Sequence, residues 1–380
     1  MHPGSLSDAD AFDEHLMRRA LELARRGQGL VEPNPMVGAV IAAPIDDGIG
    51  GPVIAEGWHA AFGGPHAEVV ALSAAGSAAR GGTLAVTLEP CCHHGKTGPC
   101  TDAIIAAGIA RVIVATRDPF PAVNGGGIDA LRRAGIEVRT GVCEAESRRL
   151  IAPFRMLIEQ RRPWLIAKWA MSLDGHVATA SGMSRWISSE PSRAIVHQLR
   201  GRVDGILCGI GTALTDDPLL TARPAGPRQP LRIVLDTAAR LPIESRLVRT
   251  AREVPVLVAT GPAASVDRLR ALSSAGCDVW QAAAADPRDR LDELLRELGS
   301  RRLTNVLIEG GPTVLGSLAD ANLIDEVWAF IAPTIIGGTA APSPIAGTGI
   351  ATLASAAAIE IEHTEHPGGD LFIRGVVRRG

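Results

Sequence analysis

A short segment between His66 and Cys100 constrains this chain more than any other part of its 380 residues. It begins with His66-Ala67-Glu68 and ends with two cysteines, Cys91 directly after Pro90 and then Cys100. One imidazole and two thiolates can hold Zn²⁺ and leave a fourth position for water. In zinc-dependent deaminases, a nearby carboxylate that does not bind the metal moves protons. The pattern therefore predicts a hydrolytic zinc site with the ligands His66, Cys91 and Cys100 and with Glu68 as its catalytic group.

The sequence around these residues supports this choice of ligands. Residues 83–88 form an apolar run typical of a buried strand that leads to Cys91, and the pattern over 101–107 predicts a helix just after Cys100. Unpaired N–H groups at a helix N-terminus stabilise a nearby thiolate and so favour metal binding. Eight residues separate Cys91 from Cys100, where the usual signature has Pro-Cys-x-x-Cys, and we expect this longer loop to have a role of its own.

Three alternatives compete with this assignment. Cys92 competes with Cys91 as a ligand, although Cys91 is the one that follows the proline, as the deaminase pattern requires. A closed structural zinc site would have no need of Glu68. Coordination by His93 or His94 in addition would leave no position for water.

The composition argues against several function classes. The formal charge of −3 and the lack of long runs of like charge give no bulk attraction to nucleic acid. No apolar run is long enough to span a membrane, and the start, Met1-His2-Pro3-Gly4, lacks the regions of a signal peptide. Six cysteines, half of them near the predicted metal site, fit a reducing compartment, so we expect a cytoplasmic protein. We expect the others, Cys143, Cys208 and Cys277, to be small apolar residues.

The length suggests two domains, which we place at residues 8–150 and 151–380. Strands and helices alternate in the first, which predicts a three-layer α/β domain. Helices are expected after a cap at Ser7, at His66, after Cys100 and over 128–134, and strands over 37–42, 53–56, 83–88, 111–116 and 136–140. A helix over 144–160, interrupted by Pro153, is expected to connect the domains.

The second half contains several continuously apolar segments, which are typical of strands covered on both faces. The expected strands cover 164–171, 205–210, 232–236, 256–260, 278–281, 305–309, 327–332 and 371–376, with helices over 192–200, 288–298 and 313–319. No Gly-x-Gly-x-x-Gly follows a strand, so an ordinary Rossmann domain is not predicted. Glycine-containing turns at 209–212, 309–312 and 336–338 together favour nucleotide binding, although each alone is more often an ordinary turn.

Two further sets of motifs stand out. The first half contains Asn34-Pro35-Met36-Val37-Gly38, Gly57-Trp58-His59, Pro65-His66-Ala67-Glu68, Thr87-Leu88-Glu89-Pro90-Cys91 and His93-His94-Gly95-Lys96-Thr97. The second half contains Lys168, Ser172-Leu173-Asp174-Gly175, Ser181-Gly182, Trp186-Ile187, Gly211-Thr212, Asp216-Asp217-Pro218 and Glu309-Gly310-Gly311. From about residue 10 to near the C-terminus, and in this order, they resemble the two halves of the bifunctional riboflavin-biosynthesis deaminase/reductase family.

The resemblance implies a fold and two activities. The fold is a cytidine-deaminase-like α/β domain followed by a dihydrofolate-reductase-like α/β domain. The first domain would deaminate 2,5-diamino-6-ribosylamino-4(3H)-pyrimidinone 5′-phosphate. The second would reduce the ribosyl group of that product to ribityl with NADPH.

The resemblance also implies site residues, matched position by position. In the deaminase half, Asn34, His59, His93, Lys96 and Asp118 would line the substrate site beside the zinc ligands. In the reductase half, the substrate positions are Lys168, Ser184, Arg200, Asp216, Leu220, Arg223 and Glu309, and the cofactor positions are Ala170, Trp186, Ser188, Thr212, Gly310 and Gly311. Lysine and arginine suit a phosphate monoester, and Asp216 would donate the proton that accompanies hydride addition. Arg200 and Arg223 are equally compatible with solvated surface charges.

The chain departs from the family pattern at two positions. The family usually has Asp-Pro-Asn-Pro where this chain has Asp118-Pro119-Phe120-Pro121, so a ring replaces an amide. We expect the nearby Asn124 to supply the missing hydrogen bond. Cys92 stands where serine is common and adds a thiol that is open to oxidation.

Two other functions compete with this one. A nucleoside or tRNA deaminase with an appended domain would be favoured by a basic stripe, which the sequence lacks. A second half that is only a structural or dimerisation module would not need Lys168, Asp216 and Glu309. From the resemblance we expect Zn²⁺ and NADPH as cofactors, small-molecule substrates, no nucleic-acid or membrane partner, and a homo-oligomer.

Overall fold

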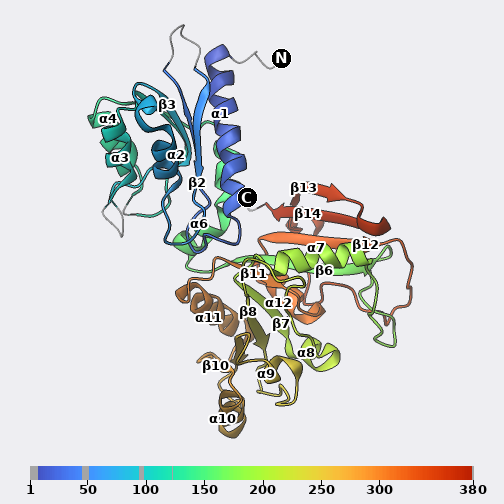
Figure 1. Cartoon of the computed structure of the whole chain (residues 1–380). Coiled ribbons are helices and arrows are strands. Elements are labelled where there is room, and N and C mark those ends of the chain that lie inside the picture. Colours follow the sequence, from blue (N-terminus) through green and yellow to red (C-terminus); the bar gives the residue numbers. More distant parts are fainter. Residues whose placement is uncertain (1–6, 45–50, 94–97, 122, 379–380) are drawn as a thin grey trace. The chain divides into compact units, whose positions relative to one another are not determined.

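The computed structural model describes residues 7–44, 51–93, 98–121 and 123–378. The chain divides into two compact units, Met1–Gln160 and Arg161–Gly380 (Figure 1). The division falls ten residues later than the one expected from the sequence, because helix α6 (Ala152–Gln160) belongs to the first unit. Each unit has its own hydrophobic clusters, as two separate α/β domains require.

The first unit is built on a five-stranded sheet with the order β2-β1-β3-β4-β5 in the described part of the chain. β1 is antiparallel to β2 and β3, whereas β3, β4 and β5 are parallel. The strands are β1 (Gly38–Ala42), β2 (Val53–Trp58), β3 (Thr83–Leu88), β4 (Arg111–Thr116) and β5 (Glu137–Thr140). The helices are α1 (Asp8–Ala24), α2 (Ala67–Ala75), α3 (Cys100–Ala107), α4 (Gly126–Arg133), α5 (Glu144–Leu150) and α6.

Alternation along the central strands explains the three layers. In β3, Leu84 and Val86 pack against helices α2, α3 and α4, while Ala85 faces α1 on the other side. Both faces are therefore apolar, and the strand is continuously buried. The parallel strands β3 and β4 end at the same edge of the sheet, which is where ligands bind in open α/β sheets. The residues after these two strands, Glu89–Cys91 and Asp118, meet there.

The second unit contains a nine-stranded sheet, counted over the described residues, with the order β10-β9-β8-β7-β11-β6-β12-β14-β13. The strands from β10 to β12 are parallel, and β14 and β13 are antiparallel additions at one edge. They are β6 (Trp164–Ser172), β7 (Gly205–Gly209), β8 (Leu231–Leu235), β9 (Val256–Thr260), β10 (Asp278–Gln281), β11 (Asn305–Ile308), β12 (Glu326–Ala332), β13 (Ile359–Glu365) and β14 (Leu371–Val377).

Helices cover both faces of this sheet. α11 (Pro287–Ser300) and α12 (Pro312–Asp320) pack on one face, and α7 (Glu190–Arg200) packs against Phe330 and Phe372 on the other. α8 (Ile210–Asp216), α9 (Arg246–Arg249) and α10 (Val266–Ser274) complete the unit. The helix expected over 144–160 is instead two helices that meet at Ile151, because Pro153 is tolerated only in the first turn of α6.

Candidate active sites

Three elements bring the predicted metal ligands together in the first unit. His66 is the N-cap of α2, Cys91 follows β3, and Cys100 is the first residue of α3. The Nδ1 atom of His66 lies 3.2 Å from Cys100 Sγ and 3.6 Å from Cys91 Sγ. All three donor atoms lie within 4.8 Å of one another, and among the described residues no further histidine, cysteine or carboxylate joins them. One imidazole and two thiols in this arrangement fit a zinc ion that keeps a position for water.

The electrostatics of the cluster favour metal binding. A hydrogen bond with Cys100 lowers the pKa of Cys91 to about 4, and the same shared proton raises the pKa of Cys100. The backbone N–H of Cys100 also donates to Cys91 Sγ over 3.3 Å. The lowered pKa favours the thiolate form of Cys91, which is the form that binds a metal. Cys92 lies outside this group, and burial raises the pKa of its thiol.

Glu68 lies in the first turn of α2, two residues after His66. It is only 3% exposed, and burial raises the pKa of its carboxyl group. The carboxyl interacts with Cys100 but is not in the cluster of metal donors. A buried carboxyl with a raised pKa beside a metal site is suited to accept a proton and return it.

Two further predicted residues form the wall of this site. His59 Nδ1 lies 2.9 Å from the carbonyl oxygen of Pro65 and therefore carries the proton, so Nε2 accepts from the Asn34 side-chain amide at 3.2 Å. Burial lowers the pKa of His59, and its ring lies 5.6 Å from the ring of His66. The structure thus brings Asn34 and His59 to the metal ligands as a neutral, hydrogen-bonded pair.

Glu89 orders the loop that carries Asp118. Its buried carboxylate accepts four backbone N–H bonds, of 2.9 to 3.2 Å, from Asp118, Gly125, Gly127 and Ile128. Sequence reasoning treated Glu89 only as part of a motif. Its buried position directly after an apolar strand is the signal that could have shown its role, because a buried carboxylate needs donors.

Asp118 is buried in this loop, whereas its neighbour Phe120 is exposed. Asp118 Oδ1 accepts the backbone N–H of Phe120, and burial raises the pKa of Asp118 to about 6. The Phe120 ring is 40% exposed and lies 6.1 Å from the ring of His93. Lys96, which we also expected at this site, lies outside the described residues, as does His94.

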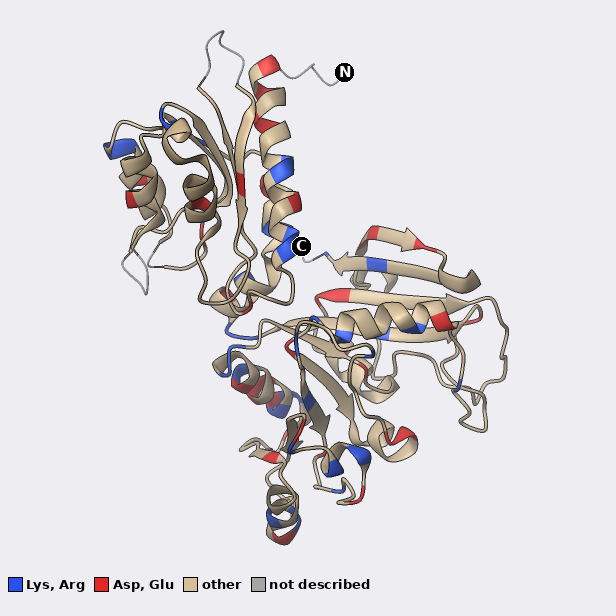
Figure 2. Ribbon diagram, viewed as in Figure 1, with Lys and Arg blue, Asp and Glu red and all other residues tan. Residues whose placement is uncertain are grey.

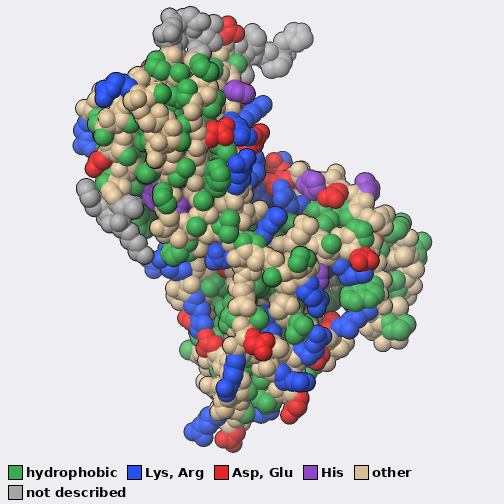
Figure 3. Space-filling view, in the orientation of Figure 1, with side chains coloured by type: hydrophobic (Ala, Val, Ile, Leu, Met, Phe, Trp, Pro, Cys, Tyr) green, Lys and Arg blue, Asp and Glu red, His purple; other side chains and the backbone are tan. Residues whose placement is uncertain are grey.

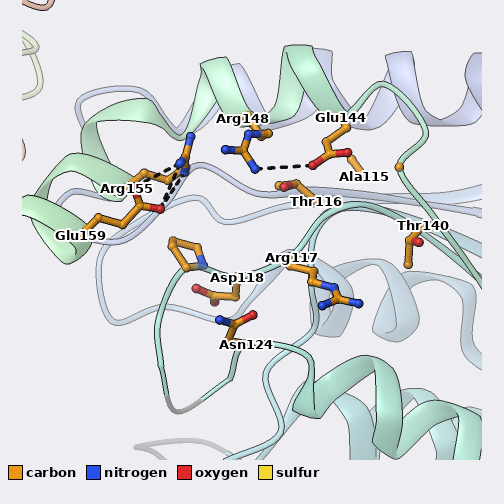
Figure 4. Close-up of a pocket in the computed structure, with 12 residues that line it drawn as sticks. Ala115, Thr116, Arg117, Asp118, Asn124, Thr140, Glu144, Arg148, Arg155 and Glu159 are labelled. Carbon is orange, nitrogen blue, oxygen red and sulfur yellow. Dashed lines mark hydrogen bonds and ion pairs between the residues drawn. The ribbon is translucent and has the colours of Figure 1, made fainter. Parts of the chain in front are cut away.

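A pocket of about 450 Å³ borders the other side of Asp118. It is lined by Asp118 and Asn124 from the loop after β4 and by α5 and α6, as Figure 4 shows. Its arginines on the helices face glutamates one turn away, Arg148 with Glu144 and Arg155 with Glu159. The charges that these helices contribute to the pocket therefore balance. Asn124 lines the same pocket beside Asp118.

In the second unit, a largely buried charged cluster forms where the end of β11 lies beside the middle of β6. Ile308 pairs with Ala167 in the parallel register, so the next residues, Glu309 and Lys168, are neighbours. Arg200 Nε and Nη2 donate to the two oxygens of Glu309 over 2.5 and 2.7 Å. Burial opposes ionisation of Glu309, but Arg200 and Lys168 outweigh it and lower its pKa. Burial also lowers the pKa of Lys168.

Two of the three predicted glycine turns, at 209–212 and 309–312, lie next to this cluster, whereas the N–H groups of Ile336 and Gly337 in the third donate to Asp174. α8 begins after Gly209, and α12 begins after Gly311. A side chain at Gly311 would approach the Thr212 hydroxyl to 3.2 Å, and one at Gly310 would collide with Val314. The predicted cofactor positions Thr212, Gly310 and Gly311 thus share one surface where backbone N–H groups of two helix starts are accessible.

The remaining predicted reductase positions lie around this surface. Ala170 continues β6, and Ser184 and Ser188 lie in the segment before α7. Trp186 in the same segment is 71% exposed, with the Arg193 guanidinium 4.4 Å from its ring centre. Asp216, the last residue of α8, pairs with Arg185 at 3.2 Å.

Leu220 and Arg223 lie in the segment after α8. Leu220 is buried, with a backbone φ of 51°, so its side chain packs into the protein and only its backbone can face a ligand. Arg223 is exposed, and its Nη2 lies 3.4 Å from His197 Nε2.

Comparisons with known proteins match both units. Residues 10–116 match the cytidine and deoxycytidylate deaminase zinc-binding region, and residues 163–373 match the RibD C-terminal domain. The riboflavin biosynthesis protein RibD of Actinobacillus pleuropneumoniae is 39% identical over 96% of this chain and 95% of its own length. The RibD protein of Aquifex aeolicus is 40% identical over 95% of this chain and 98% of its own.

The chain belongs to the RibD family of riboflavin biosynthesis. Solved structures of the family agree with the whole fold. RibD of Acinetobacter baumannii has a TM-score of 0.84 at 34% identity and covers 97% of this chain and 100% of its own. The diaminohydroxyphosphoribosylaminopyrimidine deaminase/5-amino-6-(5-phosphoribosylamino)uracil reductase of Thermotoga maritima has a TM-score of 0.81 at 35% identity, with coverage of 97% and 99%. The expected fold class, a deaminase-like domain before a reductase domain, is confirmed by these RibD matches.

Proposed function

We propose that this chain catalyses two steps of riboflavin biosynthesis, first deamination of the diaminopyrimidine ribosyl phosphate and then reduction of its ribosyl group with NADPH. The observation that carries the proposal is the convergence of His66, Cys91 and Cys100 beside Glu68 in the same chain as the Lys168–Arg200–Glu309 cluster. The Thermotoga maritima relative, a combined deaminase and reductase, supports this pairing.

In the deaminase unit, His66, Cys91 and Cys100 would hold zinc, which supplies an acidified water when bound. As a water oxygen adds to the ring carbon that bears the exocyclic amino group, Glu68 would take one proton of that water and pass it to the amino nitrogen, while the other proton ends on the ring nitrogen. The bond from the carbon to the amino nitrogen would then break, releasing ammonia and leaving a carbonyl. Asn34, His59, His93, Lys96 and Asp118 bind the ring and the ribosyl phosphate.

In the reductase unit, Ala170, Trp186, Ser188, Thr212, Gly310 and Gly311 would hold NADPH, which would supply a hydride when bound. The reduction would place this hydride on C1 of the ribosyl group, break the bond from C1 to the ring oxygen, and give that oxygen a proton. Asp216 is the proton donor in this proposal. Lys168, Ser184, Arg200, Leu220, Arg223 and Glu309 hold the sugar phosphate.

The charge distribution and the sheet edge bear on partners. Basic and acidic residues are interleaved on both units, which suits small substrates better than nucleic acid (Figure 2). Among the described helices, none has both the length and the apolar character needed to cross a bilayer. We further propose that the chain acts in the cytoplasm. We also propose that it forms a homo-oligomer, because strand β13 is exposed along its whole length at the sheet edge.

Two assays on the zinc-loaded chain test the proposal. We expect ammonia release from the diamino substrate and NADPH oxidation when the deaminated product is supplied. Ammonia release without NADPH oxidation would indicate that the chain is a deaminase whose second half has only a structural role. Ammonia release from free cytidine but not from the ribosyl phosphate would favour a nucleoside deaminase instead. We also expect a higher kcat/KM with NADPH than with NADH, and equal values would contradict the cofactor assignment.

A further inference from the structure

His197 lies in the reductase unit but has no role in the chemistry proposed above. It is on α7, three residues before Arg200, so the two side chains share a face of the helix. The ring is half-buried, and its Nδ1 atom is fully buried. Its Nε2 atom lies 3.4 Å from Arg223 Nη2.

The partner of Nε2 fixes the state of the ring. A guanidinium can only donate hydrogen bonds, so Nε2 is the acceptor and the proton sits on Nδ1. The charged groups that face the ring are Arg200, Arg223 and Glu309; burial and the two arginines together lower the pKa of His197. The ring is therefore neutral and able to accept. Among the described residues, no hydrogen bond of ordinary length reaches the buried Nδ1 atom, and an interaction of the ring with the Thr221 backbone raises the pKa of His197 but is outweighed by burial and the two arginines.

The two arginines near His197 are in different situations. Arg200 is engaged on all sides, with Glu309 on Nε and Nη2 and the Thr221 carbonyl on Nη1. Arg223 is exposed, and no carboxylate within the described part of the chain forms an ion pair with it. Its Nε and Nη1 donors therefore remain open to a ligand, while Nη2 is held by the imidazole.

We propose that His197 is a positioning residue for Arg223, holding Nη2 so that the other guanidinium donors meet the 5′-phosphate of the reductase substrate. Two N–H groups aimed in parallel at a phosphate need a fixed guanidinium plane, which a flexible exposed arginine lacks on its own. α7 thus holds the segment 221–223 at two points, through Arg200 at the Thr221 carbonyl and through His197 at Arg223. This inference rests on the proposed reductase function.

A double-mutant cycle on the full-length, zinc-loaded chain tests the pairing. His197→Leu removes the acceptor, and we expect the reductase KM for the phosphorylated substrate to rise about tenfold, the loss of about one hydrogen bond, with kcat little changed. The KM for the same compound without its phosphate should not move. Arg223→Ala should raise the KM for the phosphorylated substrate at least as much, and the double variant should be no worse than Arg223→Ala alone.

Two matched variants separate positioning from general damage. His197→Gln offers an amide oxygen at similar reach and should recover most of the lost affinity. His15→Leu, an exposed histidine on α1 in the other unit, should have no effect. Equal losses with both substrates, or additive losses in the double variant, would overturn the proposal.

A readout without substrate separates this inference from the proposed function. In ¹⁵N-histidine spectra of the ligand-free chain, Arg223→Ala should raise the pKa of His197, because a positive charge and a donor to the neutral ring are both lost. An unchanged pKa would overturn the contact itself. A wild-type chain that oxidises no NADPH would instead overturn the proposed function and the phosphate role with it, even if the pKa moved as expected.

Discussion

The zinc site and the reductase site differ in how much of each the folded chain assembles by itself. The three metal donors converge within 4.8 Å, and the neighbouring side chains are buried and hydrogen-bonded to one another. In the reductase unit the Lys168–Arg200–Glu309 cluster is enclosed, while Trp186 is 71% exposed and Arg223 faces solvent. Metal–ligand bonds are short, so their donors must be placed in advance, whereas groups that contact a large cofactor remain hydrated until it binds.

Charge is also handled differently in the two regions. In the deaminase unit, buried carboxyl groups next to the metal site, Glu68 and Asp118, have raised pKa values because burial outweighs the opposing effect of His66 and His93. In the reductase unit, Glu309 is equally buried but has a lowered pKa because Arg200 and Lys168 surround it. The first arrangement keeps a proton available for transfer, and the second keeps a fixed negative charge that orders two cations.

The strongest test of the prearranged metal site is removal of its ligands. Cys91→Ser and Cys100→Ser should each lose the single zinc ion and all deaminase activity, because each removes one of only three protein ligands. Cys92→Ser is the matched control and should keep the metal, since its sulfur lies outside the donor cluster. Metal content by atomic absorption decides the matter, and equal zinc loss in the Cys92 variant would refute the ligand assignment.

The two sites should also fail independently. Glu68→Gln keeps the size of the side chain but cannot relay a proton, so ammonia release should fall at least about a hundredfold. Reduction of supplied deaminated product should stay near the wild-type rate. Conversely, Asp216→Asn should slow NADPH oxidation and leave ammonia release unchanged. Loss of both activities in either folded, zinc-loaded variant would show that the two sites are not separate.

The enclosed part of the reductase site should matter for stability as well. Arg200→Met leaves Glu309 without its bidentate partner in an environment where both side chains are less than 15% exposed, and should cost about 3 kcal/mol of unfolding free energy. The exposed pair Arg378–Glu360 in the same unit is the control, and Arg378→Met should cost less than about 1 kcal/mol. Five of the six tryptophans lie in this unit, so intrinsic fluorescence during urea unfolding follows it. Similar losses in the two variants would mean that the cluster adds little to stability.

Sequence reasoning was most successful where chemistry fixes the spacing. The strand 83–88, the helix start at Cys100 and the N-terminal position of His66 were all expected and are all present, because ligand geometry and local periodicity point to the same elements. The Ser7 cap of α1 is confirmed by its acceptance of the Asp10 N–H.

Other elements were missed for identifiable reasons. α8 follows directly on β7 with no break, so the sequence suggested only a glycine turn there. α9 is a single turn capped by Ser245, too short for a periodic pattern. α10 was also missed, although Ser265 precedes it. β13 alternates isoleucine with glutamate, which could have indicated a strand, but all of its residues are exposed. Exposed hydrophobic side chains are common in this unit, and Figure 3 shows others on the visible surface around α7.

Contacts between distant residues were beyond sequence reasoning. The buried Asp13 of α1 pairs with Arg111 and Arg139 on β4 and β5, and the fully buried Arg232 donates to the carbonyls of Leu219, Leu247, Thr250 and Val254. Glu89 and His197 belong to the same class. Each is polar and at least half-buried, and its partners come from segments whose approach depends on the whole fold.

The smallest expected effect concerns the loop after β4, where this chain differs from the family pattern. Asn124 lines a pocket together with Asp118 (Figure 4). The Phe120 ring is exposed and lies near His93. If Asn124 supplies the polar contact that Phe120 cannot make, Asn124→Ala should lower the deaminase kcat/KM about tenfold more than Phe120→Ala does, because a hydrogen bond to the substrate is then lost. Phe62→Ala removes another exposed ring of the same unit and should leave kcat/KM unchanged. A larger loss in Phe120→Ala would mean that the ring itself packs on the substrate beside His93. The loop would then resemble the reductase site, because its binding group would be exposed until the substrate binds. It would differ in this from the adjacent metal site, whose donors are already in place.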